Sequence, residues 1–337
     1  PTTWITAEDV HIVGEDGAQA TSMVLYPTTS GELVWERFGA QDETGAWSVN
    51  IDLAGRVAST TYHVNSLKLG DVEKVSVGTL LTRHPAPGFT IYYSDSVPTA
   101  LVADLQNHLS NTALLLERRI GTEMTQIPDV YLTGNRELMK LVGTVTGINL
   151  GFEDGYYTNF GDRPGIFLRT DLFGTSVRRV LTHEYVHHIF VGLANDEPLP
   201  AWLTEGLSTF YEFDTELLGP RPDAVRLRQF TSTDLARTAS QAGSLFSLAD
   251  LESQADWNFR TDEDELALQY AESYMAVRFL IETYGPLSGK DLVMEIGLGS
   301  DLADSIKTVT GLELADFESQ FGGWLKAWEN PERAVLA

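Results

Sequence analysis

Three of the seven histidines of this chain lie within the stretch LTHEYVHHIF, residues 181–190. His183 and His187 are four positions apart, a spacing that stacks two side chains on one face of an α-helix. Both imidazoles can therefore reach a single metal ion without distortion of the backbone. Glu184 is rotated by about 100° around the helix axis from His183. Its carboxylate can thus lie against a water molecule on the ion rather than on the ion itself.

The residues around this stretch predict the helix that such a site requires. Residues 174–192 read GTSVRRVLTHEYVHHIFVG, in which Thr175 or Ser176 can cap the first turn and Gly192 can end the last. His188 falls on a different face, so we assign it a structural or supporting role. The pattern His-Glu-x-x-His pairs two metal ligands with a general base. A polar helix whose histidines are satisfied by hydrogen bonds stays open as an alternative.

A third ligand is predicted in the segment NDEPLPAWLTEGLSTFYEF, residues 195–213. Its two prolines allow a new helix to begin near Ala201, and its apolar residues recur at helical spacing. Glu205 lies close to this apolar stripe rather than on the opposite face. Burying a carboxylate there without a counter-ion is costly, so a cation is expected beside it. Glu212 is an alternative ligand, two turns further on.

The composition narrows the kind of metal site. The chain has no cysteine, so a metal must be held by His, Asp or Glu. A metzincin site would need Gly at position 190 and His at position 193, where this chain has Phe190 and Leu193. Two histidines, one glutamate and an open position for water are typical of catalytic zinc. The sequence therefore favours a zinc site completed by Glu205 ahead of Glu212.

The segments before the predicted helix at residues 174–192 indicate an α+β fold. Residues 1 to about 86 contain short alternating runs between turn clusters, the pattern of a small β-sandwich. These runs are SMVLY, GELVWERF, AWSVNIDL, STTYHVNSLKLG and EKVSVGTLL. The segment RHPAPG, residues 83–88, carries two prolines and a glycine and marks the boundary of this domain. We therefore expect a β-rich domain at residues 1–87 and a second domain at residues 88–337.

In the second domain, strands and helices alternate at first, and the pattern beyond residue 172 is helical. FTIYYS, IPDVYLTG and GIFLRT predict strands, residues 98–120 and NRELMKLVG predict helices, and GYYTNFGDRPG predicts a glycine-rich loop. GIFLRT is either an edge strand that pairs with an extended peptide or an ordinary strand of the sheet. We expect a mixed α/β lobe at about residues 88–192 and a helical lobe at about residues 193–337.

Charge and hydropathy bear on partners and location. The chain has 48 acidic and 23 basic residues, a formal net charge of −25. Such a surface repels phosphate backbones and anionic headgroups, which disfavours nucleic acid and membrane surfaces as partners. No apolar run approaches the roughly 18 residues that a membrane helix needs. The chain begins at Pro1 without a methionine, so we expect a removed upstream segment and a secreted or cell-surface bacterial protein.

HEYVHHIF followed by LPAWLTEGLSTFYE resembles the gluzincin zinc metallopeptidases, more closely the bacterial "peptidase MA-like" group. That group has a His-Glu-x-x-His helix and then a Pro-x-Trp-x-x-Glu-Gly segment. QYAESYMAVRFLIETYG and TGLELADFESQFGGWLKAW also resemble its C-terminal helices, so the resemblance covers roughly residues 89–330. It implies a thermolysin-like (zincin) fold with a cleft between the two lobes. It also implies one zinc ion per chain on His183, His187 and Glu205, with Glu184 as the base.

Departures from the family pattern concern the substrate and the groups around the metal. Gluzincin aminopeptidases carry a Gly-x-Met-Glu-Asn signature that binds a free amine, and its absence here gives an exopeptidase no support. Thr209 stands where thermolysin-like relatives place an aspartate that supports a ligand histidine. Tyr270, in ALQYAESYMAVRFL, is a candidate for stabilising the oxyanion. Alternatively, Tyr270 and Tyr274 are core aromatics one turn apart.

The sequence therefore predicts a zinc metallopeptidase, most simply an endopeptidase acting on a peptide or protein substrate. Glu184 would take a proton from the attacking water and deliver it to the leaving amine. Two alternatives belong to other classes of protein. One is a binding module that keeps the zinc scaffold without catalysis, and the other is a cell-surface binding protein led by the β domain at residues 1–87. Nothing in the sequence indicates the oligomeric state.

Overall fold

The computed structural model describes residues 10–14, 26–27, 33–34, 47–50, 61–69, 80–122, 126–145, 154–159, 164–172 and 176–329. These residues divide into two compact units. The first falls within Pro1–His84, Tyr92–Val97 and Tyr131–Glu153, and the second within Pro85–Ile91, Pro98–Val130 and Asp154–Ala337. Every residue predicted to do chemistry belongs to the second unit.

The described residues of the N-terminal segment form β structure, as the alternating runs predict. One antiparallel sheet has the order β1-β5-β4, from Val10–Gly14, Thr61–Leu69 and Trp47–Asn50. β2 (Tyr26–Pro27) pairs with β3 (Leu33–Val34) in a separate two-stranded sheet. The run at residues 73–81 lies almost wholly outside the described residues. The β-sandwich and the domain boundary near residue 87 stay predictions.

A five-stranded sheet has the order β6-β7-β8-β10-β9. Its strands are β6 (Thr82–Ala86), β7 (Phe89–Tyr93), β8 (Asp129–Thr133), β9 (Gly155–Thr158) and β10 (Gly165–Arg169). β7, β8 and β10 confirm the three strands predicted from the sequence. β10 lies between β8 and β9, so of the two alternatives for GIFLRT the ordinary strand holds and the edge strand does not. Among the described strands, β9, with the sequence GYYT, has that edge position.

Two strands come from segments that the sequence did not predict as strands. RHPAPG contributes to β6 and to the turn before β7. Pro85 is tolerated because β6 is the first strand in the order and, among the described strands, pairs with β7 alone. Gly88 has φ +86°, which a residue with a side chain rarely adopts. β9 was hidden because its four residues lie in a glycine-rich segment, where composition favours a loop.

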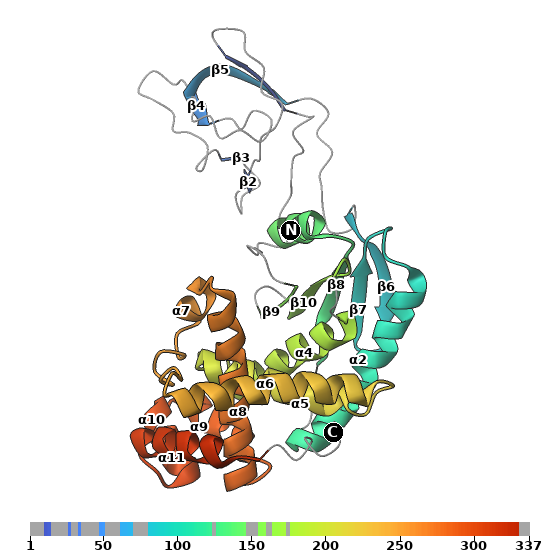
Figure 1. Ribbon diagram of the computed structural model, residues 1–337. Helices are drawn as coiled ribbons and strands as arrows, with labels where there is room; N and C mark the ends of the chain where they lie inside the picture. Colours follow the sequence, from blue (N-terminus) through green and yellow to red (C-terminus); the bar gives the residue numbers. More distant parts are fainter. Residues whose placement is uncertain are drawn as a thin grey trace. The chain divides into compact units, whose positions relative to one another are not determined.

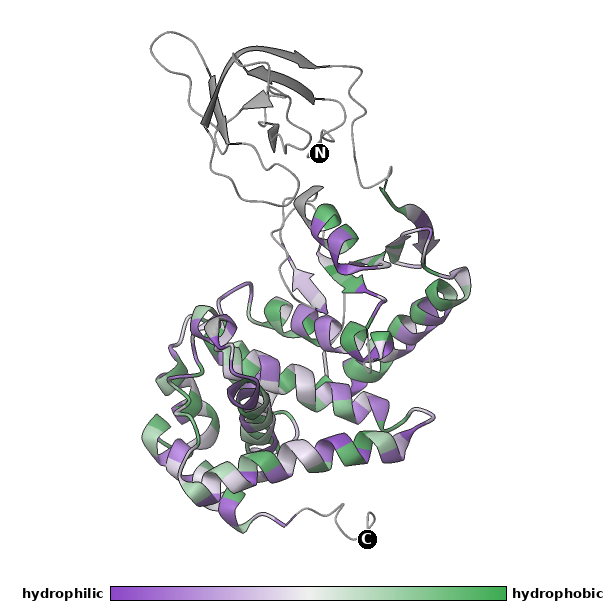
Figure 2. Cartoon of the chain, turned by 45° about the horizontal axis from the view of Figure 1, so that its top comes forward, coloured by the Kyte–Doolittle hydropathy of each residue, from purple (hydrophilic) through white to green (hydrophobic). Residues whose placement is uncertain are grey.

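The remaining elements are helices, and beyond residue 172 all regular structure of the described chain is helical, as predicted. Figure 1 shows the helices that follow residue 200 gathered together, and in Figure 2 hydrophobic and hydrophilic residues alternate around the helices. Their bounds are α2 Thr99–Ile120, α3 Arg136–Val145, α4 Val177–Leu193, α5 Ala201–Glu216, α6 Pro222–Ala242, α7 Gln254–Phe259, α8 Glu263–Tyr284, α9 Ser288–Gly297, α10 Leu302–Thr310 and α11 Leu314–Ala327. Within the described residues, none of these helices has the length and apolarity needed to cross a membrane.

The ends of α4 differ from the sequence prediction. Ser176 occupies the N-cap position but its side chain makes no capping hydrogen bond, and Thr175 lies outside the described residues. Gly192 lies inside the helix rather than at its end. The chain leaves the helix through Asn195 and Asp196, both with positive φ. Asn and Asp tolerate this left-handed region better than most residues, and so replace the glycine expected there.

Helix α5 packs against α8 at a position that only glycine can occupy. A Cβ atom at Gly206 would clash with the backbone carbonyl oxygen of Ser273, on α8, and would lie 2.8 Å from Cγ2 of Val277. The obstacle is mainly backbone, which cannot turn away as a side chain can. Gly206 therefore lets α5 approach α8 closely, and this approach sets the depth of the adjacent Glu205 in the protein interior.

Replacing Gly206 with alanine should lower the free energy of unfolding by about 1–3 kcal/mol, the usual cost of overpacking a core. The matched control is Gly192→Ala on α4, where an added Cβ meets nothing within 4 Å. That variant should be unchanged or up to about 1 kcal/mol more stable, because alanine favours a helix interior. Denaturant unfolding followed by circular dichroism measures both. Equal stability of the two variants would contradict the packing argument.

Candidate metal centre

Helices α4 and α5 bring the three predicted ligands together. One nitrogen of His183, one nitrogen of His187 and a carboxylate oxygen of Glu205 lie within 4.8 Å of one another. Nε2 of His183 is 3.2 Å from Oε2 of Glu205, and Nε2 of His187 is 3.7 Å from Oε1. No other His, Asp and Glu side chains of the described residues form such a group. Both Nε2 atoms thus point at the same carboxylate.

The other nitrogen of each imidazole has a partner on α5. Nδ1 of His183 lies 3.2 Å from Oε2 of Glu212, and Nδ1 of His187 lies 2.9 Å from Oγ1 of Thr204. Histidines that bind metals usually donate their second nitrogen to such groups, which fixes the ring and its tautomer. Glu212, considered from the sequence as an alternative ligand, therefore lies on the far side of His183 and supports it.

Glu212 is itself held by two arginines. Its Oε1 lies 3.4 Å from Nη1 of Arg179, on α4, and 3.4 Å from Nη1 of Arg228, on α6. Arg228 also pairs with Glu216, one turn further along α5. Glu212 is 4% exposed, so these two cations offset the cost of burying its charge. The support of His183 therefore extends through three helices.

The electrostatics of the group call for a positive charge. Burial alone would lower the pKa of His183, but hydrogen bonds to Glu205 and Glu212 outweigh it and raise the pKa to about 10. Burial lowers the pKa of His187 to about 4 despite the carboxylate of Glu205. Burial would raise the pKa of Glu205, yet the two histidines hold it below its usual value. Two imidazoles, one carboxylate and this demand for charge fit a zinc ion.

Glu184 is buried on α4. It lies next to His183, His187 and Glu205, which we call the ligand group, but does not belong to it. It exposes 8% of its surface. Strand β9 lies directly against it, because a Cβ atom at Gly155 would lie 3.0 Å from Oε1 of Glu184 and would clash with Val180. Gly155 thus leaves room for the Glu184 side chain. The predicted base is held between its own helix and the last strand of the sheet.

Tyr270 is not a core aromatic. It lies on α8, exposes 40% of its surface and packs edge-to-face on Trp257, with ring centroids 5.0 Å apart. Its pKa is strongly raised, first by the carboxylate of Glu205 and then by burial of the hydroxyl end. The hydroxyl therefore lies within the electric field of the Glu205 carboxylate. Tyr274, one turn away, is 1% exposed and packs against Phe213. The alternative that both tyrosines are core aromatics therefore holds for Tyr274 and not for Tyr270.

Trp257, from the short helix α7, is a contributor that the sequence did not reveal. Its indole is 2% exposed and packs against the Tyr270 ring. This contact limits how far the Tyr270 ring can turn on its helix. No spacing in the sequence links Trp257 to Tyr270, because the two residues lie on different helices.

His188 takes no part in the ligand group. Its Nδ1 lies 3.2 Å from the hydroxyl of Tyr157, on β9, and its Nε2 lies 2.8 Å from the carbonyl oxygen of Gln126. Burial lowers the pKa of His188. The structural role predicted for this histidine from its helical face is therefore confirmed.

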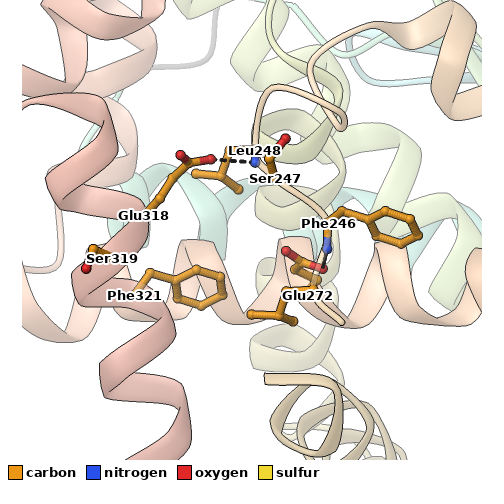
Figure 3. A pocket seen from close by; sticks show the side chains of 8 residues that line it. Phe246, Ser247, Leu248, Glu272, Glu318, Ser319 and Phe321 are labelled. Carbon is orange, nitrogen blue, oxygen red and sulfur yellow. Dashed lines mark hydrogen bonds between the residues drawn. The ribbon is translucent and has the colours of Figure 1, made fainter. Parts of the chain in front are cut away.

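A cavity of about 340 Å³ lies apart from these residues, among α8, α11 and residues 245–248 (Figure 3). Glu272 accepts the N–H of Phe246 at 3.0 Å, and Glu318 accepts the N–H of Leu248 at 2.6 Å. Burial raises the pKa of Glu272 to about 8. None of the predicted site residues lines the cavity. Its two carboxylates anchor the loop before α7.

Comparison with protein families points to one kind of protein. The model of the Peptidase MA superfamily matches residues 171–327, so this part of the chain is similar to that superfamily. The match includes α4, α5 and α8, which hold the ligand group, Glu184 and Tyr270. No curated protein matches the chain.

Solved structures similar to this chain include a mutant M1 zinc metallopeptidase from Deinococcus radiodurans bound to a Tyr-Ser-Ala substrate. It is 16% identical with a TM-score of 0.44, over 75% of this chain and 53% of that chain. The native LTA4 hydrolase of yeast is 11% identical with a TM-score of 0.43, over 97% of this chain and 51% of that chain. The chain thus spans about half the length of these two proteins.

Replacing Glu212 with glutamine should weaken zinc binding by about 10- to 100-fold, because His183 loses its carboxylate partner. The matched control is Glu216→Gln, on the same helix and paired with Arg228 but with no histidine. Its zinc affinity should stay within about twofold of the parent chain. Competition with a chromophoric chelator measures both affinities. Equal losses in the two variants would show that general acidity, rather than the bond to His183, matters for the metal.

Proposed function

We propose that this chain is a zinc-dependent metallopeptidase that hydrolyses peptide bonds, with one zinc ion on His183, His187 and Glu205. The observation that carries the proposal is the convergence of three donor atoms within 4.8 Å, with buried Glu184 on the next face of the same helix. The match of residues 171–327 to the Peptidase MA superfamily supports it. Two imidazoles and one carboxylate are the ligand set of catalytic zinc in several hydrolases.

The roles of the protein groups follow from their positions. Bound zinc would lower the pKa of a water molecule and polarise a carbonyl group. Glu184 takes the proton of the attacking water and then delivers it to the leaving amine. Because Gly155 packs against its side chain, the carboxylate has little room to turn away from this task.

Tyr270 donates a hydrogen bond to the carbonyl oxygen as negative charge develops on it. The strongly raised pKa keeps the hydroxyl protonated, so it acts as a donor at any physiological pH. The Trp257 ring packs edge-to-face on Tyr270 and helps to fix the orientation of its side chain. Such a donor acts mainly on the transition state, where the oxygen is most negative.

The substrate we propose is an extended peptide or protein segment cleaved internally. β9 is the last strand of the described sheet, and a sheet edge can take an extended peptide as an additional strand. The missing Gly-x-Met-Glu-Asn signature argues against recognition of a free amino terminus. The secreted or cell-surface location inferred from the sequence stays a prediction.

Replacing Glu184 with glutamine should leave zinc binding intact and reduce peptide cleavage by about 10²- to 10⁴-fold, the usual contribution of a general base. A library of internally quenched peptides measures cleavage, and metal analysis of the same samples measures zinc. Equal cleavage by both proteins would point to a contaminating peptidase. Failure of the parent chain to bind zinc after reconstitution would sink the proposal. Bound zinc without cleavage of any peptide would favour the binding module that lacks catalysis.

Replacing Tyr270 with phenylalanine should lower kcat by about 10²- to 10³-fold with little change in KM, because the lost hydrogen bond acts in the transition state. Tyr274→Phe is the matched control. The Tyr274 hydroxyl accepts from Arg278 at 3.1 Å in the core, so its loss should reduce stability by about 1 kcal/mol and leave kcat unchanged. Similar kcat values for the two variants would remove Tyr270 from the mechanism.

A further inference from the structure

His188 joins three segments of the chain through one ring. The Gln126 carbonyl can only accept, so the Nε2 atom of His188 carries a proton and donates to it at 2.8 Å. In the neutral ring, Nδ1 then accepts from the Tyr157 hydroxyl at 3.2 Å. The rings of His188 and Tyr157 are also in contact, with centroids 5.4 Å apart. His188, which follows the predicted ligand His187, thus links helix α4 to strand β9.

Alternate residues of β9 and the position after it face α4, as the period of a strand requires. Gly155 contacts the Glu184 side chain at the start of the strand. Tyr157 bonds His188 in the middle. Asn159, directly after the strand, donates from Nδ2 to Oδ1 of Asp196 at 2.7 Å. Strand β9 is therefore fixed along its whole length, to helix α4 and to the turn that follows α4.

The turn at the end of α4 holds Asn159 through Asp196. Asn195 has φ 51° and Asp196 has φ 63°, a left-handed conformation that Asn and Asp adopt more readily than most residues. The Asn195 amide donates to the carbonyl of Gly297 at 3.1 Å, and the N–H of Asp196 donates to the carbonyl of Val191 at 3.1 Å. These two bonds hold the turn in place. The turn thus presents Asp196 to the end of β9.

β9 needs this fixation more than the inner strands. It is last in the strand order, so among the described strands only β10 pairs with it. A small shift of β9 would move the backbone that packs on Glu184, and misplacement of about 1 Å can cost a large part of a catalytic rate. The position of β9 therefore bears directly on the predicted base.

We propose that Tyr157 and His188 form a tether that sets β9 on α4 at the level of Glu184, and that both are positioning residues for peptide hydrolysis. The proposal rests on the proposed function for its catalytic part. The tether holds β9 in place, and β9 in turn holds the Glu184 side chain. It does not take part in zinc binding, which we assign to the three ligands. His188 thus has a task in the site that is distinct from that of the histidine beside it.

The test uses the full chain, reconstituted with zinc, and variants that remove only the bond between the two side chains. Tyr157→Phe removes the hydroxyl and keeps the ring. His188→Gln keeps a donor near the place of Nε2 and loses the acceptor at Nδ1, whereas His188→Asn keeps an acceptor near Nδ1. Tyr92→Phe, on β7, is the matched control for loss of a tyrosine hydroxyl in the same sheet.

Hydrogen exchange of the amides in residues 154–159 measures the hold on β9. Tyr157→Phe and His188→Gln should each speed this exchange by roughly 3- to 10-fold, the effect of one lost hydrogen bond. The double variant should exchange no faster than either single one, because both remove the same bond. His188→Asn should exchange more slowly than His188→Gln, and Tyr92→Phe should match the parent chain. Unchanged exchange in both single variants, or additive effects in the double variant, would overturn the tether.

Zinc content and kinetics separate positioning from mere structure. Both single variants should keep one zinc per chain, and kcat on the fastest-cleaved library peptide should fall roughly 3- to 10-fold with KM unchanged. Loss of zinc in His188→Gln would assign this histidine to the metal and refute the proposal. Faster exchange with unchanged kcat would refute the positioning role. If the parent chain cleaves no peptide, the proposed function fails, and hydrogen exchange and zinc content still decide whether the tether exists.

Discussion

The burial of the Glu205 carboxylate between two imidazoles is the constraint on which the arrangement of the helical part depends. Glu205 is 8% exposed and faces Nε2 of both His183 and His187. A carboxylate at this depth is stable only beside positive charge. The two helices that carry these residues must therefore keep fixed positions relative to each other. Several of the contacts around them hold these positions.

The depth of Glu205 is set from both sides of α5. Gly206 allows the backbone of α5 to contact that of α8. At the start of the helix, the N–H groups of Ala201 and Trp202 donate to the carbonyls of Glu252 and Leu251, both at 2.9 Å. These groups belong to the first turn, which has no partners within its own helix. The loop before α7 therefore fixes where α5 begins, and its anchoring by the carboxylates of Glu272 and Glu318 contributes indirectly to the candidate metal centre.

The sequence predicted those site residues whose positions depend only on the geometry of a single helix. The pair His183 and His187 followed from helical periodicity, and Glu205 from its place beside an apolar stripe. Glu212 was within reach of the same reasoning, because seven residues return a side chain to nearly the same helix face. Its role as a partner of His183, rather than a ligand, depends on how two helices approach each other. Strand β9 was missed for a similar reason, since four residues in a glycine-rich segment become a strand only through pairing with β10.

The two histidines of the ligand group are chemically unequal, although helical spacing presents them as a pair. Nδ1 of His183 faces a carboxylate, whereas Nδ1 of His187 faces a hydroxyl. Burial alone would lower both pKa values, but hydrogen bonds to Glu205 and Glu212 raise that of His183 to about 10, whereas that of His187 falls to about 4. A carboxylate partner makes an imidazole the more basic ligand. We therefore expect His183 to be the stronger donor to a bound cation, with Glu212 contributing to that strength.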